Sequence, residues 1–190
     1  MRKLFLFMNV SLDGYFEGQG HDISQFHNEE NPFEAYSSDE GGAVDALLFG
    51  HRTYDMMKNF WPTPQAQESA PEIAQFMNEK HKYVASHQPF EPGWAKVTVF
   101  HNDIVDQVRK LKGQPGNTIA MFGSNNLCVT LMQAGLVDEF QIMLNPIVLG
   151  LGTTLFAGLQ KKADLRLKDL RRFQSGTVLL TYVPGDVETR

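Results

Sequence analysis

The sequence of 190 residues has only one cysteine, Cys128. A single thiol cannot form an internal disulfide, which excludes a disulfide-stapled extracellular domain and favours the cytoplasm. No apolar run approaches the ~18 residues that a membrane span requires. The apolar stretch after Met1 stops at Asn9, without the small-residue cleavage site of a signal peptide. We therefore expect neither a membrane partner nor secretion.

Positive charge and metal-ligand motifs are also scarce. No run of Lys or Arg exceeds two residues and the formal net charge is −5, so we expect no nucleic-acid partner. The six histidines form no pair with the helical spacing of a zinc site, and no metal site is predicted. With 42% hydrophobic residues the chain can bury one sizeable core, which predicts a single domain over residues 1–190.

Apolar periodicity predicts the fold class. Strands are predicted at residues 4–10, 43–49, 82–85, 96–100 and 117–122, with amphipathic helices between the later ones. After Asp138 the apolar period changes to two, as expected for antiparallel strands. We predict an α/β three-layer fold, with a mostly parallel central sheet, helices on both faces and an antiparallel C-terminal hairpin.

Four turns that contain glycine or serine follow predicted strands, at residues 11–14, 50–53, 86–89 and 123–126. The carboxyl ends of parallel strands meet at one edge of a sheet, where ligands bind. The turns at Gly50 and Gly123 open predicted helices, whose free N–H groups favour a phosphate, and Arg52, Thr53 and Ser124 add donors. Alternatively, the glycines only permit tight turns and Ser124 is an ordinary helix cap.

The order of these segments resembles the dihydrofolate reductase fold. It is most similar to stand-alone relatives of the reductase domain of riboflavin biosynthesis, the RibD C-terminal domain. The similarity covers nearly the whole chain and rests on residues 11–14, 50–54, 60–62, 86–89, 122–124, 146–152 and 155–156. The family's members are reductases, so the resemblance implies a hydride transfer from a nicotinamide cofactor.

The resemblance also implies which residues bind that cofactor. Gly50, Thr53 and the segment from Gly123 to Leu127 would hold the pyrophosphate of NADPH, and the turn after the third strand would flank its adenosine end. His51 occupies the place of the family's 2′-phosphate arginine and Arg52 follows it, so NADH is the alternative cofactor. If Arg52 serves the 2′-phosphate, Arg52→Ala weakens NADPH selectively. The implied cofactor-binding residues are Gly50, His51, Arg52, Thr53, Ser86, His87, Gly123, Ser124, Asn125, Asn126 and Leu127.

Asp13 is the candidate catalytic residue, because the hydride transfer needs a matching proton. Its ordinary pKa of about 3.9 would have to rise in an apolar pocket, to which Tyr15 and Trp61 could contribute. Alternatively, Asp13 orients its turn or only binds the substrate. The candidate substrate-contacting residues are Asp13, Tyr15, Trp61, Gly150 and Gly152. The helix acid of dihydrofolate reductases has candidates at Asp22, Glu29, Glu30, Glu34, Asp39 and Glu40.

Two departures from the RibD pattern bear on the substrate. Phe7 stands where these reductases usually carry Lys, and Tyr15 stands where they tend to have a basic residue. Both remove charge that a phosphoribosyl substrate would need. We therefore expect an NAD(P)H-dependent reductase of a small planar heterocycle, of pterin or aminopyrimidine type, that forms a homodimer as the resembled family does. The alternatives are a non-catalytic nucleotide- or flavin-binding protein on the same fold, and an acidic adaptor acting through residues 22–42.

Overall fold

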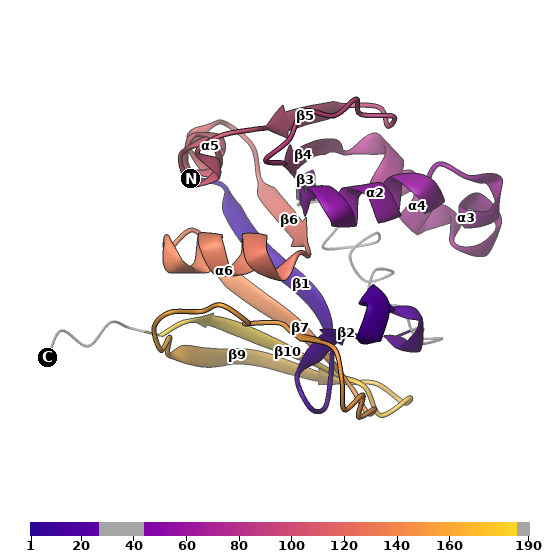
Figure 1. Ribbon diagram of the computed structural model, residues 1–190, viewed down its shortest axis with the longest axis vertical. Coiled ribbons are helices and arrows are strands. Elements are labelled where there is room, and N and C mark those ends of the chain that lie inside the picture. The colour runs from indigo at the N-terminus through magenta and orange to yellow at the C-terminus, as the bar shows by residue number, and fades with distance from the viewer. Residues whose placement is uncertain (27–43, 186–190) are drawn as a thin grey trace, which may run out of the picture.

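The chain folds around an eight-stranded sheet, and the computed structural model describes residues 1–26 and 44–185 (Figure 1). In chain order, the strands of this sheet are β1 (Lys3–Ser11), β3 (Val44–Gly50), β4 (His81–Ala85), β5 (Val97–Phe100), β6 (Thr118–Phe122), β7 (Glu139–Asn145), β9 (Leu165–Arg172) and β10 (Val178–Pro184). Their order across the sheet is β5-β4-β3-β6-β1-β7-β10-β9. The apolar β1 is therefore buried at its centre.

The strand directions confirm the predicted topology. Neighbouring strands from β5 to β7 are all parallel, whereas β10 is antiparallel to both β7 and β9. On β1, Phe7 pairs with Phe122 of β6 on one side and with Gln141 of β7 on the other. Because the strands from β5 to β7 are parallel, the carboxyl ends of β1, β3, β4, β6 and β7 lie at one edge of the sheet.

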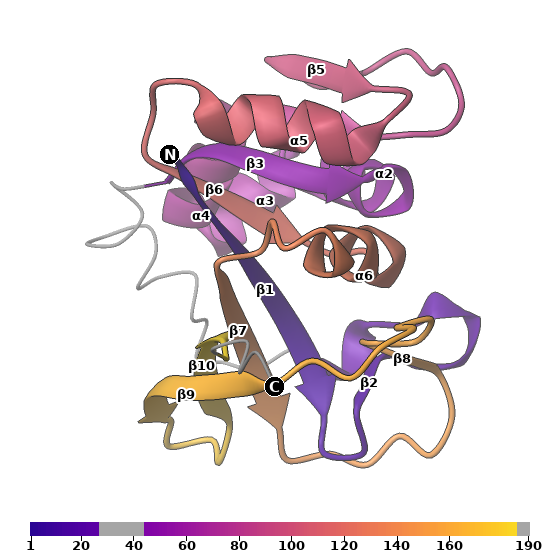
Figure 2. The same cartoon turned by 90° about the vertical axis from the view of Figure 1, so that its left-hand side faces the viewer.

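Helices cover both faces of the sheet, as predicted (Figures 1 and 2). The helical segments are η1 (Gln19–His21), η2 (Ser24–Phe26), α2 (His51–Phe60), α3 (Pro64–Ser69), α4 (Pro71–Glu79), α5 (Ile104–Gly113) and α6 (Asn125–Gln133). Val108 of α5 and Leu131 of α6 pack on one face, whereas Tyr54 of α2 and Phe76 of α4 pack on the other. Within residues 1–26 and 44–185, no helix is both long and apolar enough to cross a membrane.

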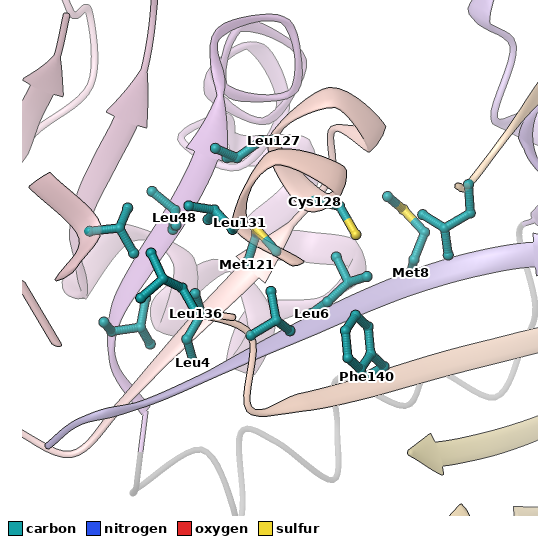
Figure 3. Close-up of a cluster of buried hydrophobic side chains, with 14 of the residues drawn as sticks. Leu4, Leu6, Met8, Leu48, Met121, Leu127, Cys128, Leu131, Leu136 and Phe140 are labelled. Atoms are coloured by element: carbon teal, nitrogen blue, oxygen red, sulfur yellow. The ribbon is translucent and has the colours of Figure 1, made fainter. Parts of the chain in front are cut away.

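Cys128 lies in the core between α6 and the sheet, close to Leu6, Met8 and Leu131 (Figure 3). The apolar residues of β1 reach this core at every second position, since side chains alternate between the faces of a strand. Burial raises the pKa of the Cys128 thiol to about 12. Such a thiol is almost never the reactive thiolate, so Cys128 contributes to the packing of the core.

Lys82 is a buried cation on β4 that joins two neighbouring segments. Its Nζ donates hydrogen bonds to the carbonyl oxygens of Asn78 at 3.0 Å, Lys80 at 2.7 Å and Ala95 at 3.3 Å. It also lies 4.5 Å from the centre of the Trp94 ring. Burial, assisted by the charge of Lys96, lowers the pKa of Lys82 to about 8. The residue therefore fastens the end of α4 to the segment before β5.

A small second sheet lies beside the carboxyl end of β1. It pairs β2 (Tyr15–Glu17) with β8 (Thr153–Thr154) in antiparallel fashion, and Figure 2 shows this pair near the end of β1. The acidic segment at residues 22–42, on which the alternative of an adaptor depends, falls mostly outside the described residues. Of the part that is described, Asp22 accepts hydrogen bonds from the backbone of Ser24 at 2.8 Å and from the side chain of Gln25 at 2.5 Å.

Candidate functional site

The two glycine turns predicted to hold phosphate lie against each other. A Cβ atom built on Gly50 would lie 2.6 Å from Oγ of Ser124, and one built on Gly123 would lie 2.9 Å from Oγ1 of Thr53. The Gly123–Ser124 peptide bond is cis, and Ser124 is the N-cap residue of α6 although its side chain makes no capping hydrogen bond. The amino ends of α2 and α6 thus open at one place on the edge of the sheet.

A cavity of about 350 Å³ lies at this edge. It is lined by Glu17, His21, Arg52, Ser124, Asn125, Asn126 and Thr153. A second hollow of about 280 Å³ shares His21 and Thr153 with it and extends along η1 to Leu151 and Gly152. The cavity combines the amino end of α6 with a guanidinium group, an imidazole and a hydroxyl, which are donors suited to an anionic ligand.

The carboxylate of Glu17 is the buried centre of the charged wall, with 4% of its side chain exposed. Arg52 Nη2 donates to its Oε2 at 2.5 Å, Thr153 Oγ1 donates to its Oε1 at 2.7 Å, and His21 Nδ1 lies 2.8 Å from Oε1. Burial alone would raise the pKa of Glu17, but the hydrogen bonds from Thr153, His21 and Arg52 outweigh it and lower that pKa. The ionised carboxylate therefore ties β2, η1, α2 and β8 together.

This cluster changes the interpretation of Arg52. The resemblance suggested Arg52 as a donor to a 2′-phosphate, but its guanidinium is bonded to Glu17 and lies on the cavity wall with Ser124. The position expected for that arginine is His51, which lies elsewhere on the same edge. The contacts of Arg52 thus do not support a 2′-phosphate role, because its side chain is directed toward β2 and η1.

Asp13 is exposed and joins two loops. Ser11 Oγ donates to its Oδ1 at 2.6 Å, and the backbone N–H groups of Leu149 and Gly150 donate to its carboxylate at 3.1 and 2.7 Å. The Ser11 hydrogen bond, opposed by slight desolvation and assisted by the backbone donors, lowers the pKa of Asp13. Proton donation at neutral pH would require the opposite shift. These contacts favour the alternative in which Asp13 orients its turn and the loop after β7.

His51 and Ser86, predicted at the adenosine end, are brought together. Nδ1 of His51 lies 3.1 Å from Oγ of Ser86, and the His51 ring stacks on Phe90 with 4.1 Å between ring centres. Its Nε2 lies 3.3 Å from a carboxylate oxygen of Asp55. His87 follows as an exposed side chain. Together, the His51–Phe90 stack and the buried Ser86 form a rim beside the Gly50 turn.

The remaining predicted residues divide between the site and other parts of the fold. Tyr15 follows the Asp13 turn and donates its backbone N–H to Ser11 Oγ at 3.0 Å, and a Cβ on Gly152 would clash with the carbonyl oxygen of Glu17. Leu127 is buried in the core, so only its backbone is available to a ligand. Trp61 lies at the far end of α2, about 15 Å along the helix from Gly50. There its indole N–H donates to Sδ of Met57 at 3.1 Å.

Sequence reasoning missed Glu17, His21 and Thr153 as members of the site. A weak signal was present, since Glu17 and His21 are four residues apart and lie within eight residues of Asp13. The candidate helix acids Glu29, Glu30, Glu34, Asp39 and Glu40 lie outside the described residues. Asp22 is described, and it bonds locally to Ser24 and Gln25.

Comparison with known proteins agrees with this architecture. Residues 2–179 match the family described as the RibD C-terminal domain. The Bacillus subtilis (strain 168) protein YyaP, described as uncharacterized, is 30% identical over 182 residues, which cover 95% of this chain and 94% of YyaP.

Solved structures show the same fold. A putative riboflavin biosynthesis protein from Shewanella sp. PV-4 superposes with a TM-score of 0.74 at 22% identity, covering 96% of this chain and 99% of that one. Dihydrofolate reductase from Enterococcus faecalis, complexed with NADP(H) and RAB-propyl, superposes with a TM-score of 0.61 at 15% identity, covering 97% of each chain. The predicted dihydrofolate reductase-like fold is confirmed.

Proposed function

The chain belongs to the RibD C-terminal domain family, and we propose that it is a reductase that transfers a hydride from NADPH or NADH to a small planar heterocycle of pterin or aminopyrimidine type. The observation that carries the proposal is the contact between the Gly50 and Gly123 turns. Two helix amino ends that open at one point provide backbone donors and positive dipole ends for a diphosphate. The similar dihydrofolate reductase from Enterococcus faecalis is itself complexed with NADP(H).

The arrangement around the turns supports a dinucleotide rather than a lone phosphate. The cavity at α6 extends from the Gly123 turn to Arg52, and the rim formed by His51, Ser86 and Phe90 lies beyond the Gly50 turn. A dinucleotide has an aromatic base to place near such a rim and a diphosphate to place between the turns. The cofactor would supply the hydride, while the protein binds and orients it and excludes water.

Arg52 provides a test of this placement. If Arg52 contacts the diphosphate from the cavity wall, Arg52→Ala should weaken NADPH and NADH alike, by roughly tenfold or more. A matched control is Arg109→Ala, because Arg109 is an exposed residue of α5 that pairs only locally, with Asp106. Selective weakening of NADPH would instead restore the 2′-phosphate role suggested by the sequence.

The apolar character of β1 supports a substrate without a phosphate. Phe7 is buried and packs edge-to-face against Phe122, with 6.2 Å between ring centres. A phosphoribosyl group requires cationic partners, and Phe7 cannot provide one. This favours a pterin or an unphosphorylated aminopyrimidine as the hydride acceptor.

One observation favours the alternative of a non-catalytic nucleotide- or flavin-binding protein. Asp13, the candidate catalytic residue, is exposed and has a lowered pKa, which does not suit a proton donor at neutral pH. On this alternative, the same turns bind a nucleotide without turnover.

Cofactor titration followed by a turnover assay separates the two functions. The full chain would be titrated with NADPH, NADH and FMN by fluorescence, and then mixed with reduced nicotinamide and a panel of dihydropterins and aminopyrimidines. Loss of absorbance at the nicotinamide band with at least one acceptor supports the reductase. Tight nucleotide binding with no oxidation on any acceptor supports the binding protein, and no binding of any nucleotide refutes both.

We also propose that the protein is a cytoplasmic homodimer. The edge strand β9 is mostly charged but exposes Leu167 and Leu170 to 47% and 54%, and a second copy of the chain would cover these two side chains. Sedimentation velocity should give a dimer that Leu170→Glu converts to monomer. A wild-type monomer at assay concentration would refute the dimer and leave the reductase proposal intact.

A further inference from the structure

His21 is contacted from two sides at one ring nitrogen. Its Nδ1 lies 2.8 Å from Oε1 of Glu17 and also 2.8 Å from Nη1 of Arg52. The same Nη1 lies 3.1 Å from Nε2, so the guanidinium nitrogen spans the edge of the imidazole ring. Both contacts occur in the wall of the 350 Å³ cavity that adjoins the amino end of α6.

Only one neutral tautomer of His21 satisfies both neighbours. A neutral imidazole carries a hydrogen on one ring nitrogen and accepts at the other. With the hydrogen on Nδ1, the ring donates to the carboxylate of Glu17 and accepts from Arg52 Nη1 at Nε2, 3.1 Å away. With the hydrogen on Nε2, the bare Nδ1 faces a carboxylate oxygen lone pair. A ligand that draws Arg52 Nη1 away therefore leaves Nε2 of the neutral ring without its donor.

The charges around His21 determine what the wall offers to a ligand. Among residues 1–26 and 44–185, the elements packed around His21 are β2, α2, β8 and α6, and the charged groups that they direct to it are Glu17 and Arg52, whereas Thr153, Asn125 and Asn126 are neutral. Glu17 is buried and Arg52 is half exposed, at 4% and 51% of their side chains. With neutral His21, the pair cancels and the wall offers an anion no net charge.

We propose that an anion entering this cavity is bound together with a proton, which His21 takes up from solvent. The anion replaces the imidazole as the acceptor for Arg52 Nη1, while Nη2 stays on Glu17. His21, now protonated at Nε2 as well, keeps donating Nδ1–H to Glu17, and its charge faces the anion. The proposed diphosphate of the cofactor is the natural occupant, so in this respect the inference rests on the proposed function.

Linkage makes the proposal measurable. If anion binding favours protonated His21, the reciprocal relation requires the affinity to fall as the pH rises through the range in which histidine titrates. If binding takes up one proton, the affinity for the anion falls by at most about tenfold for each unit of pH. Glu17 is already ionised throughout that range, because its pKa is lowered, so the pH dependence belongs to His21.

The test measures proton uptake directly. NAD⁺ is the first probe, since its diphosphate does not titrate between about pH 5.5 and 8.5. Calorimetric titration of the full chain near pH 7, in two buffers of different ionisation enthalpy, gives the number of protons bound with the ligand. Sulfate is the second probe, read as the rise in Tm that it causes at about pH 6 and pH 8. His21→Gln is the variant, and the exposed His101→Gln is its control.

We expect the wild type and His101→Gln to take up a proton with NAD⁺, and sulfate to stabilise both more strongly at the lower pH. His21→Gln should bind without uptake and without pH dependence. Binding of NAD⁺ by the wild type with no uptake overturns the inference and leaves the proposed function standing. If sulfate raises Tm in a pH-dependent way that requires His21 but NAD⁺ does not bind, the anion site is supported and the proposed dinucleotide cofactor is refuted. Binding of neither probe overturns both.

Discussion

The contact between the two glycine turns implies that a methyl group at Gly50 has no room. A Cβ there would lie 2.6 Å from Ser124 Oγ, about 0.8 Å closer than the 3.4 Å at which ordinary contact begins. The φ of −75° at Gly50 suits alanine, and the entropic gain of such a change is about 0.4–1 kcal/mol. Overpacking at this scale costs about 1–3 kcal/mol. We expect Gly50→Ala to lose roughly 1–2 kcal/mol of stability, lowering Tm by about 2–8 °C.

A double-mutant cycle isolates the cause of that loss. Urea and thermal unfolding would be compared for Gly50→Ala, Ser124→Ala and the double variant. Without the Ser124 hydroxyl, the nearest atom to the new methyl is Ser124 Cβ at 3.4 Å, so the double variant should be as stable as Ser124→Ala. Gly113→Ala is the matched control, because nothing lies within 4 Å of its Cβ position. An equal loss from Gly50→Ala with and without the hydroxyl would refute the contact between the turns.

Three further predictions concern charged residues. Lys82→Met leaves three carbonyl oxygens without their donor and should cost about 1–3 kcal/mol. Because native Lys82 has a pKa of about 8 and the unfolded chain retains that proton to about pH 10.4, wild-type stability in urea should rise relative to Lys82→Met between those values. The lowered pKa of Glu17 means that its carboxylate stabilises the fold at higher pH and that this contribution is lost as the pH falls below about 4.5. In thermal melts below that pH, Glu17→Gln should therefore lose less stability than the wild type. Asp13→Ala should raise KM for the acceptor without moving the pH optimum of turnover, because the Asp13 carboxylate is already ionised; a shifted optimum would return Asp13 to the role of acid.

The main sheet was predictable because its strands carry strong local signals. The apolar run at residues 4–10 predicted the central strand β1, and the change of period after Asp138 predicted the reversed β10. The strands β2 and β8, of three and two residues, are too short to show any period. They form because the Asp13 turn contacts the loop after β7. That contact uses the backbone N–H groups of the loop, and such groups leave no recognisable pattern in a sequence.

The site was predictable only in part, for a similar reason. The Gly50 and Gly123 turns were predictable because each is a glycine between an apolar strand and a helix, a pattern contained within a few neighbouring residues. The bond from Arg52 to Glu17 joins residues that are 35 positions apart, and it forms only once β2 packs beside α2. The sequence therefore indicated Arg52 as a donor without indicating what it would bond. Trp61 lies at the opposite end of α2 from the Gly50 turn, a separation that its residue type alone does not indicate.

The burial of Cys128 makes this chain convenient for thiol labelling. Maleimides react with the thiolate, and a sole cysteine with a pKa near 12 in a closed core presents almost none. A cysteine introduced on the cavity wall would then be the one site that accepts a fluorophore, with no background to remove. In the unaltered chain, the slow rate at which Cys128 is modified would instead report how often local unfolding separates α6 from the sheet.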